Sequence, residues 1–160
     1  MHYTTLREQL LTYLSPGEIL PKMPKPTHSE NGGDGLKPFV TVNETLTKIP
    51  PDAANHDPDR LIFAEGRGMR PWEGNKILPR AMTTSGGQNY HPSGTRDFTL
   101  REYACLQGFP LNHVFMGTGI KKQIGNAVPP CVAAVLFKSI KRDLDEADGV
   151  VDSQDIIMID

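Results

Sequence analysis

Cysteine is scarce in this chain of 160 residues, which contains only Cys105 and Cys131. Two thiols are too few for a disulfide framework or a four-cysteine zinc site. The sequence has no apolar run near the ~20 residues of a membrane span, and its first residues lack the basic and apolar regions of a secretory signal. We therefore expect a protein of a reducing compartment, the cytosol or the nucleus, with no membrane partner.

Aromatic residues are also few, at 7%, and hydrophobic residues reach 38%, below the usual total of ~45–50%. Glycine and proline are frequent instead, with 15 and 14 residues. Because both residue types interrupt helices and strands, loops should occupy much of a chain whose length suits one ordinary domain.

The net charge of −2 conceals two regions of opposite charge. Between positions 60 and 101, seven Arg or Lys residues are opposed by three Asp or Glu residues. Positions 143–160 contain seven acids and no Lys or Arg. The basic middle region is compatible with contacts to nucleic-acid phosphates, and a solvated loop face explains the same charges equally well.

Short elements separated by turns are predicted for the first two thirds of the chain. Apolar spacing predicts an amphipathic helix over residues 6–14, followed by an extended, Pro-rich segment and a flexible Gly-rich loop. A strand is predicted over residues 39–42, and a short helix over residues 44–48 with Asn43 as its cap. Residues 51–91 contain only brief apolar pieces between turns, which predicts an irregular strand-and-loop lobe.

Two helices are predicted in the last third. Thr99 and Glu102 have the spacing of a capping box, which predicts a helix that runs through Leu106 and ends near Gly108. A second helix is predicted to begin at the two prolines 129–130 and to stop near residue 149. Its single apolar stripe comprises Val128, Cys131, Val132, Val135, Leu136, Ile140 and Leu144.

Two sequence blocks in this region form a specific combination. Residues 96–110 read RDFTLREYACLQGFP, and residues 122–130 read KQIGNAVPP. In this order and at this separation they resemble the last two conserved motifs of the cytosine-C5 DNA methyltransferases. Residues 20–28 resemble the segment after that family's eighth motif, and residues 82–92 resemble the end of its target-recognition region.

The resemblance implies the C-terminal part of a Rossmann-like α/β methyltransferase that uses S-adenosylmethionine, with a small irregular strand-and-loop target-recognition lobe. It implies a helix and extended segment leaving the catalytic lobe at 1–35, the recognition lobe at 36–95, return helices at 96–147 and an acidic tail at 148–160. Enzymes of the family methylate carbon 5 of a flipped-out cytosine in DNA. Their Pro-Cys-Gln loop, Glu-Asn-Val strand and glycine-rich cofactor turn have no counterpart in this sequence.

This chain therefore has no predicted catalytic residue, and we expect it to be inactive without a missing N-terminal catalytic lobe. Cys131 follows a proline, as the family's nucleophile does, but it lies on an apolar helix stripe and precedes Val rather than Gln. Cys105 lies on the capped helix. Both thiols are expected to pack as small hydrophobic groups.

The turn before the second helix contains the predicted cofactor contacts. By resemblance, Asn126 and Val128 match positions that contact the methionine end of S-adenosylmethionine. From its position alone, Asn126 serves equally well as a helix cap. Because the chain would hold only part of the pocket, it should bind the cofactor weakly.

A polar constellation upstream can contact double-stranded DNA. Thr offers a methyl and a hydroxyl group, Arg can bind guanine through two hydrogen bonds, and Gln and Asn suit adenine. An ordinary polar surface loop is the alternative, and the resemblance favours DNA contact. The residues concerned are Arg80, Thr83, Thr84 and Arg96, with Gln88 and Asn89 nearby.

Three residues of the first motif are expected to be architectural. Glu102 can close the capping box, and Arg101 can hold loop carbonyls with its fork of donors. The Gln107 amide either ties the helix to the recognition lobe or simply ends the helix.

Two other functions stay open: a DNA-binding or regulatory module without catalysis, and a relative that methylates tRNA. No metal site is predicted, because His56, Asp57 and Asp59 lack a second pair of ligands at a recognisable spacing. The expected location is the nucleus, or the cytoplasm in a prokaryote.

Overall fold

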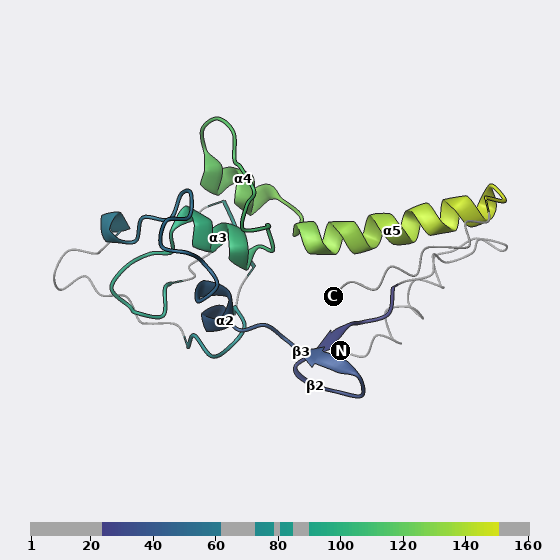
Figure 1. Ribbon diagram of the computed structural model, residues 1–160, viewed down its shortest axis with the longest axis horizontal. Coiled ribbons are helices and arrows are strands. Elements are labelled where there is room, and N and C mark those ends of the chain that lie inside the picture. Colours follow the sequence, from purple (N-terminus) through teal and green to yellow (C-terminus); the bar gives the residue numbers. More distant parts are fainter. Residues whose placement is uncertain (1–23, 62–72, 79–80, 85–89, 151–160) are drawn as a thin grey trace. The chain divides into compact units, whose positions relative to one another are not determined.

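The computed structural model describes residues 24–61, 73–78, 81–84 and 90–150 (Figure 1). The chain divides into two compact units, one of Pro26–Ala134 and one of Met1–Lys25 with Val135–Asp160. The helix predicted over residues 6–14 lies outside the described residues, as does Arg80. The mixture of helices and strands agrees with the predicted α/β class at this coarse level.

A small sheet forms near the start of the larger unit. Its strands β1 (His28–Ser29), β2 (Asn31–Gly33) and β3 (Leu36–Pro38) lie in the order β1-β3-β2. The β1–β3 pair is parallel and the β2–β3 pair is antiparallel. Asp34 and Gly35 have φ angles of 51° and 79°, as a two-residue hairpin turn requires.

The strand predicted over residues 39–42 is therefore wrong, and so is the flexible loop predicted before it. The Asp34-Gly35 turn pairs β2 with β3, so the strand ends at Pro38. The next helix, α2 (Val42–Leu46), already begins at the last residue of the predicted strand.

Thr41, rather than Asn43, is the N-cap of α2. The Thr41 side chain accepts a hydrogen bond from the Glu44 amide at 3.3 Å, and the Thr41 amide donates to Glu44 Oε2 at 2.7 Å. This reciprocal capping box outcompetes Asn43 because it satisfies two orphan donors at once. Asn43 lies inside the helix, where its side chain donates to Asn75 at 2.9 Å.

The capped helix of the first motif is confirmed as α3 (Leu100–Leu106). Thr99 Oγ1 accepts from the Glu102 amide at 3.1 Å, and Glu102 Oε2 accepts from the Thr99 amide at 2.7 Å. After the helix, Gly108 has a φ of 82°, which lets the chain turn away as predicted.

One helix of the larger unit was not predicted. Helix α4 (Ile120–Asn126) begins after Gly119, which has a φ of 71° and makes no side-chain cap. The missing cap and the internal Gly125 conceal it in the sequence. Ile120 and Ile124, one turn apart, are the residues that pack against the core, and this spacing is the signal that could have revealed it.

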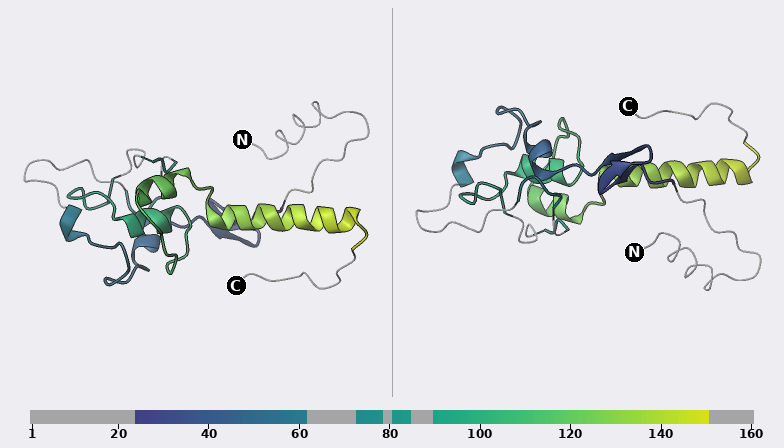
Figure 2. Two further views of the ribbon diagram at one scale, coloured as in Figure 1. Left: turned by 90° about the horizontal axis from the view of Figure 1, so that it is seen from above. Right: turned by 90° about the horizontal axis from the view of Figure 1, so that it is seen from below.

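Helix α5 (Pro130–Ala147) begins at the second proline, as predicted, and both views of Figure 2 show it as one uninterrupted helix. None of its residues is buried. Its predicted stripe is exposed instead of packed, with exposed fractions of 47% at Val132 and 51% at Ile140.

Within the described parts of the chain, no helix combines the length and apolar character needed to cross a lipid bilayer.

The core of the larger unit lies around α3, which packs against both α2 and α4. Between residues 51 and 91, the described segments contain turns and a short 3-10 helix (Asp59–Leu61) but no strand. The loops of this unit are therefore anchored by a small number of buried core side chains. The core cluster consists of Val42, Met82, Phe98, Tyr103, Ala104 and Ile124.

Candidate nucleic-acid and cofactor interface

Arg96, in the loop before α3, forms a bidentate ion pair with Glu102, in the first turn of α3. Arg96 Nη1 donates to Glu102 Oε2 at 2.8 Å, and Nη2 donates to Oε1 at 2.7 Å. Their side chains are 13% and 4% exposed, so solvent screens the pair little. Burial opposes the charge on Glu102, but hydrogen bonds from Arg96 and Thr99 still hold its pKa below the usual value.

The Arg96 guanidinium also binds two residues of its own loop. Arg96 Nη1 donates to the Asp97 carbonyl at 2.9 Å, and Nη2 donates to His91 Nε2 at 2.8 Å. Arg96 thus has a structural role in anchoring residues 91–97 to α3. Its predicted contact with DNA stays a prediction, and such a contact would compete with Glu102 for the fork of donors.

His91 should make stability depend on pH. Burial, followed by the charge of Arg96, holds the pKa of His91 below its usual value of 6.5, with a smaller opposing effect from Glu102 and a further lowering by His56. The unfolded chain therefore binds a proton that the folded chain resists. The free energy of unfolding should fall as the pH drops from about 6.5 towards the lower folded-state pKa.

His91→Gln should flatten this part of the pH profile, as measured by urea unfolding at pH 7.5 and at successive lower values. His28→Gln, at an exposed position, controls for the loss of one imidazole. If the pH dependence of the unfolding free energy is unchanged in His91→Gln, His91 is not its source.

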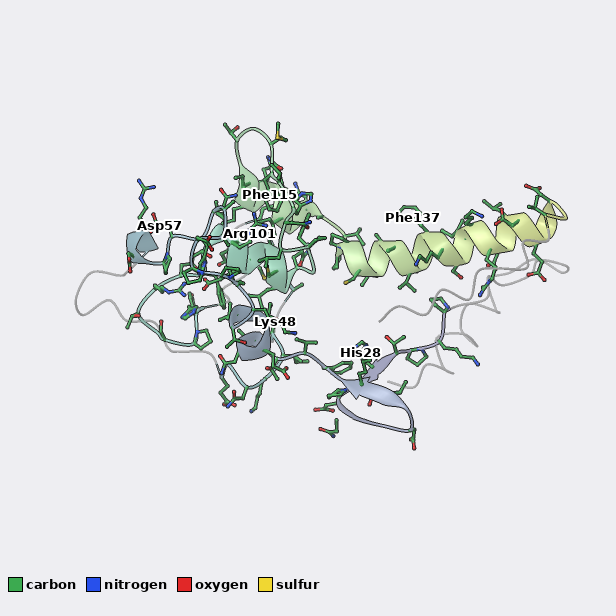
Figure 3. The ribbon with its side chains drawn as sticks, viewed as in Figure 1. His28, Lys48, Asp57, Arg101, Phe115 and Phe137 are labelled. Atoms are coloured by element: carbon green, nitrogen blue, oxygen red, sulfur yellow. The ribbon has the colours of Figure 1, made fainter. Side chains whose placement is uncertain are left out.

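Arg101 has the architectural role predicted for it. Its side chain is buried, and it donates from Nε to the Ala54 carbonyl at 2.8 Å and from Nη2 to the His113 carbonyl at 3.0 Å. Its guanidinium lies 5.9 Å from the centre of the Phe115 ring, and Figure 3 shows the two side chains as neighbours. Arg101 thereby joins two loops to α3.

Asp97 connects α3 with α4. Its Oδ1 accepts hydrogen bonds from the Tyr103 hydroxyl and the Phe98 amide, both at 2.8 Å. Its Oδ2 accepts from Lys121 Nζ at 3.3 Å, and this ammonium lies 4.5 Å from the centre of the Tyr103 ring. Burial, with the adjacent Asp97 carboxylate, raises the pKa of Tyr103, so this hydroxyl remains a donor.

The turn that contains the predicted cofactor contacts lies between α4 and α5. Asn126 is the last residue of α4, four residues before α5 begins, so it is not the N-cap of α5. Asn126 is exposed, and Val128 is 61% exposed. Gln107 is the C-cap of α3, and its Nε2 donates to the Ala127 carbonyl at 2.8 Å, so its amide joins the end of α3 to this turn rather than to the predicted recognition lobe.

The structure brings two of the predicted DNA contacts next to this turn. Thr83 and Thr84 are exposed, and their backbone packs directly against Gly125, the residue before Asn126. This contact of Gly125 was not predicted from the sequence. A glycine inside a helix was the available signal, since it often marks a close backbone approach.

The two thiols, Cys105 and Cys131, differ in their surroundings. Burial raises the pKa of Cys105, which disfavours its thiolate. Cys131 is exposed, so its predicted burial is wrong, although its Sγ lies close to Gly108. Among the residues that the structure describes, no three His, Cys, Asp or Glu side chains gather as a metal site would require.

Comparisons with known proteins agree with these motifs. Residues 24–142 match the family model for C-5 cytosine-specific DNA methylases. The chain is 34% identical over 150 residues to type II methyltransferase M.NgoFVII of Neisseria gonorrhoeae, which covers 73% of this chain and 40% of that protein. It is 36% identical over 104 residues to DNA (cytosine-5)-methyltransferase 1B of Oryza sativa subsp. japonica, which covers 61% of this chain and 6% of that protein.

An archaeal protein is also similar. The putative type II methyltransferase M.MJ0563P of Methanocaldococcus jannaschii is 32% identical over 128 residues, which covers 66% of this chain and 41% of that protein. The chain thus spans about two fifths of the length of these prokaryotic relatives and a much smaller share of the plant protein.

Proposed function

This chain belongs to the family of C-5 cytosine-specific DNA methylases, and we propose that it supplies the target-recognition lobe and part of the cofactor site of such an enzyme. The complete enzyme would hold a Rossmann-like catalytic lobe and would methylate carbon 5 of a cytosine in double-stranded DNA. The target base would be flipped out of the duplex, because its reacting atom is inaccessible within the stack. The enzyme would work where the DNA is, in a nucleus or in a prokaryotic cytoplasm.

The position of the turn between α4 and α5 is the observation that carries this proposal. Thr83 and Thr84 are exposed and their backbone packs against Gly125, which directly precedes the exposed Asn126. Groups suited to DNA and groups suited to the cofactor therefore occupy neighbouring positions. A methyl donor and the strand that receives the methyl group must approach each other in the same way.

The described residues fit one wall of a site for S-adenosylmethionine. Asn126 offers a side-chain amide that can hydrogen-bond the amino and carboxylate groups of the methionine end, and Val128 offers an apolar surface beside it. The hydrogen bond from Gln107 to the Ala127 carbonyl fixes the backbone between Asn126 and Val128. When bound, the cofactor supplies the methyl group, and this chain's part is to position it.

We propose that the remaining part of a methyltransferase covers α5. The stripe on this helix is exposed at Val132, Val135, Leu136 and Ile140, and exposed apolar surface of this kind marks an interaction site. Covalent catalysis at the target cytosine needs a nucleophile, which the family resemblance implies is a Cys thiolate. In our proposal this group belongs to the covering lobe, so the chain alone does not transfer methyl groups.

A chimaera tests the function directly. In the Neisseria gonorrhoeae relative, the segment matched by this chain is replaced with residues 24–142, and transfer of radiolabelled methyl groups to duplex DNA and to tRNA is measured. The chimaera should methylate duplex DNA, and Asn126→Ala should raise its KM for S-adenosylmethionine by about tenfold, the effect of one lost hydrogen bond to a charged group.

Asn112→Ala, at an exposed loop position, is the matched control and should leave the KM unchanged. A chimaera that methylates tRNA in preference to DNA would replace the proposed substrate with RNA. An inactive, folded chimaera, together with DNA binding by the natural chain, would instead favour a recognition module without catalysis.

A further inference from the structure

Gly125 occupies a place where no side chain fits. A Cβ atom built on Gly125 would overlap the Thr84 nitrogen and the Thr83 carbonyl carbon, and would lie 2.6 Å from the Thr83 oxygen. These atoms all belong to the backbone, so no side-chain rotation can make room. A side chain at position 125 would therefore require one of the two main chains to move.

Both segments are fixed at this approach by the core. Met82, directly before the threonines, is 9% exposed, and Ile124, directly before Gly125, is 1% exposed. Both side chains belong to the same buried cluster. A side chain at position 125 therefore cannot be accommodated by a free movement of either segment, and one backbone must be displaced.

The turn after Gly125 is held from the other side by the end of α3. Gln107 binds the Ala127 carbonyl at 2.8 Å. A Cβ on Gly108 would lie 3.8 Å from Pro129 Cβ and 2.9 Å from Cys131 Sγ, so these residues are also closely packed. Residues 126–129 are thus located by contacts within this chain.

We propose that Gly125 is a positioning residue that sets the distance between the Thr83–Thr84 segment and the turn at 126–129, so that the two move as one body. The assignment of DNA to the first and cofactor to the second rests on the proposed function. The mechanical connection between them rests on the close packing alone. Any displacement of the recognition segment when DNA binds would be transmitted to the turn through Gly125.

Gly125→Ala and Gly74→Ala, each made in the full chain, form a matched pair. The three atoms nearest to a Cβ on Gly74 all belong to the side-chain amide of Asn43, an exposed residue whose amide can rotate at the cost of its hydrogen bond to Asn75. Alanine also favours a helix over glycine, so any loss in Gly125→Ala does not arise from helix propensity. Amide chemical shifts should change in Gly125→Ala at 83–84 and at 126–128 together, and in Gly74→Ala only around 43 and 75.

DNA binding supplies a readout that a purely structural role would not move. Fluorescence anisotropy with a labelled duplex, far below the unfolding temperature, should show a roughly tenfold weaker affinity for Gly125→Ala, the loss of one directed contact. In a chain that already carries Thr83→Ala and Thr84→Ala, the same glycine substitution should change the affinity less than twofold, because the side chains through which it acts on DNA are already absent. Equal effects in the two backgrounds would overturn the proposal.

Two outcomes separate this proposal from the proposed function. A natural chain that binds no duplex at any salt concentration would count against the proposed function, while the amide shifts of Gly125→Ala would still decide the connection. Shifts confined to either segment would refute it. Where Gly125→Ala does not fold, titration of the natural chain with duplex decides: the amides of 126–128 should shift with those of 83–84.

Discussion

Replacing Glu102 with alanine is expected to lower the free energy of unfolding by about 3–5 kcal/mol, the usual cost of removing one partner of a buried ion pair. The substitution leaves the Arg96 guanidinium, only 13% exposed, without its bidentate carboxylate. It also removes the acceptor of the Thr99 amide and so opens the capping box of α3. Such a loss is a large fraction of the 5–15 kcal/mol that stabilise a typical domain.

Urea unfolding followed by circular dichroism measures this loss. Lys76→Ala is the control, because Lys76 and Glu73 form an ion pair whose side chains are 65% and 67% exposed; such pairs contribute about 0–1 kcal/mol. Glu102→Gln keeps the shape and the capping acceptor, so it should lie between the two. If Glu102→Ala lowers the free energy of unfolding no more than Lys76→Ala does, the buried ion pair does not stabilise the fold.

A double substitution distinguishes the penalty of a lone charge from the value of the pair. Arg96→Met combined with Glu102→Leu removes both charges and leaves no unpaired ion. This variant should be more stable than Glu102→Ala alone, even though it lacks the same ion pair. A loss equal to the sum of the two single substitutions would show that the two groups contribute independently.

The elements that the sequence predicted correctly depend on neighbouring residues. Thr99 and Glu102 stand three positions apart, and the prolines at the start of α5 act on the adjacent backbone. Capping and proline rules need no tertiary information. Thr41 and Glu44 carry the same capping signal, so α2 was misplaced because Asn43 was preferred over a better local candidate.

The contacts that organise the candidate site lie beyond such rules. Arg101 binds a carbonyl 47 positions away, and Gly125 meets the threonines at 83 and 84. Sequence separation of this size leaves no periodic trace, so spacing alone cannot pair the segments. The resemblance to a family predicted DNA contacts at Thr83 and Thr84 and cofactor contacts at Asn126 and Val128 as separate groups, and the fold shows that the Thr83–Thr84 backbone packs against Gly125.

The exposure of α5 has a different origin. Its apolar stripe was correctly located from its spacing, but the expected burial depends on a partner surface. Val132 and Ile140 are about half exposed in this chain. An amphipathic pattern predicts that a helix face will be covered, and it does not identify the covering element.

Replacing Ile124 with alanine is expected to cost about 2–5 kcal/mol of unfolding free energy, the range for large-to-small substitutions in a core. Ile124 is 1% exposed and belongs to the core cluster with Met82 and Tyr103. Helix α4 has seven residues and no side-chain cap, too few for an isolated helix to be stable in water. Its order therefore depends on packing, and Ile124 is the only buried residue it contributes.

A graded series tests this dependence. Ile124→Val should cost about 0.5–1.5 kcal/mol, and Val114→Ala, at a residue that is 72% exposed, should stay within about 0.5 kcal/mol. Hydrogen exchange should accelerate at residues 120–126 in Ile124→Ala before the rest of the larger unit is affected, because this short helix loses the buried residue that anchors it. If Ile124→Ala costs no more than Val114→Ala, α4 is not held by the core, and the fixed position of Gly125 beside Thr83 and Thr84 loses its structural basis.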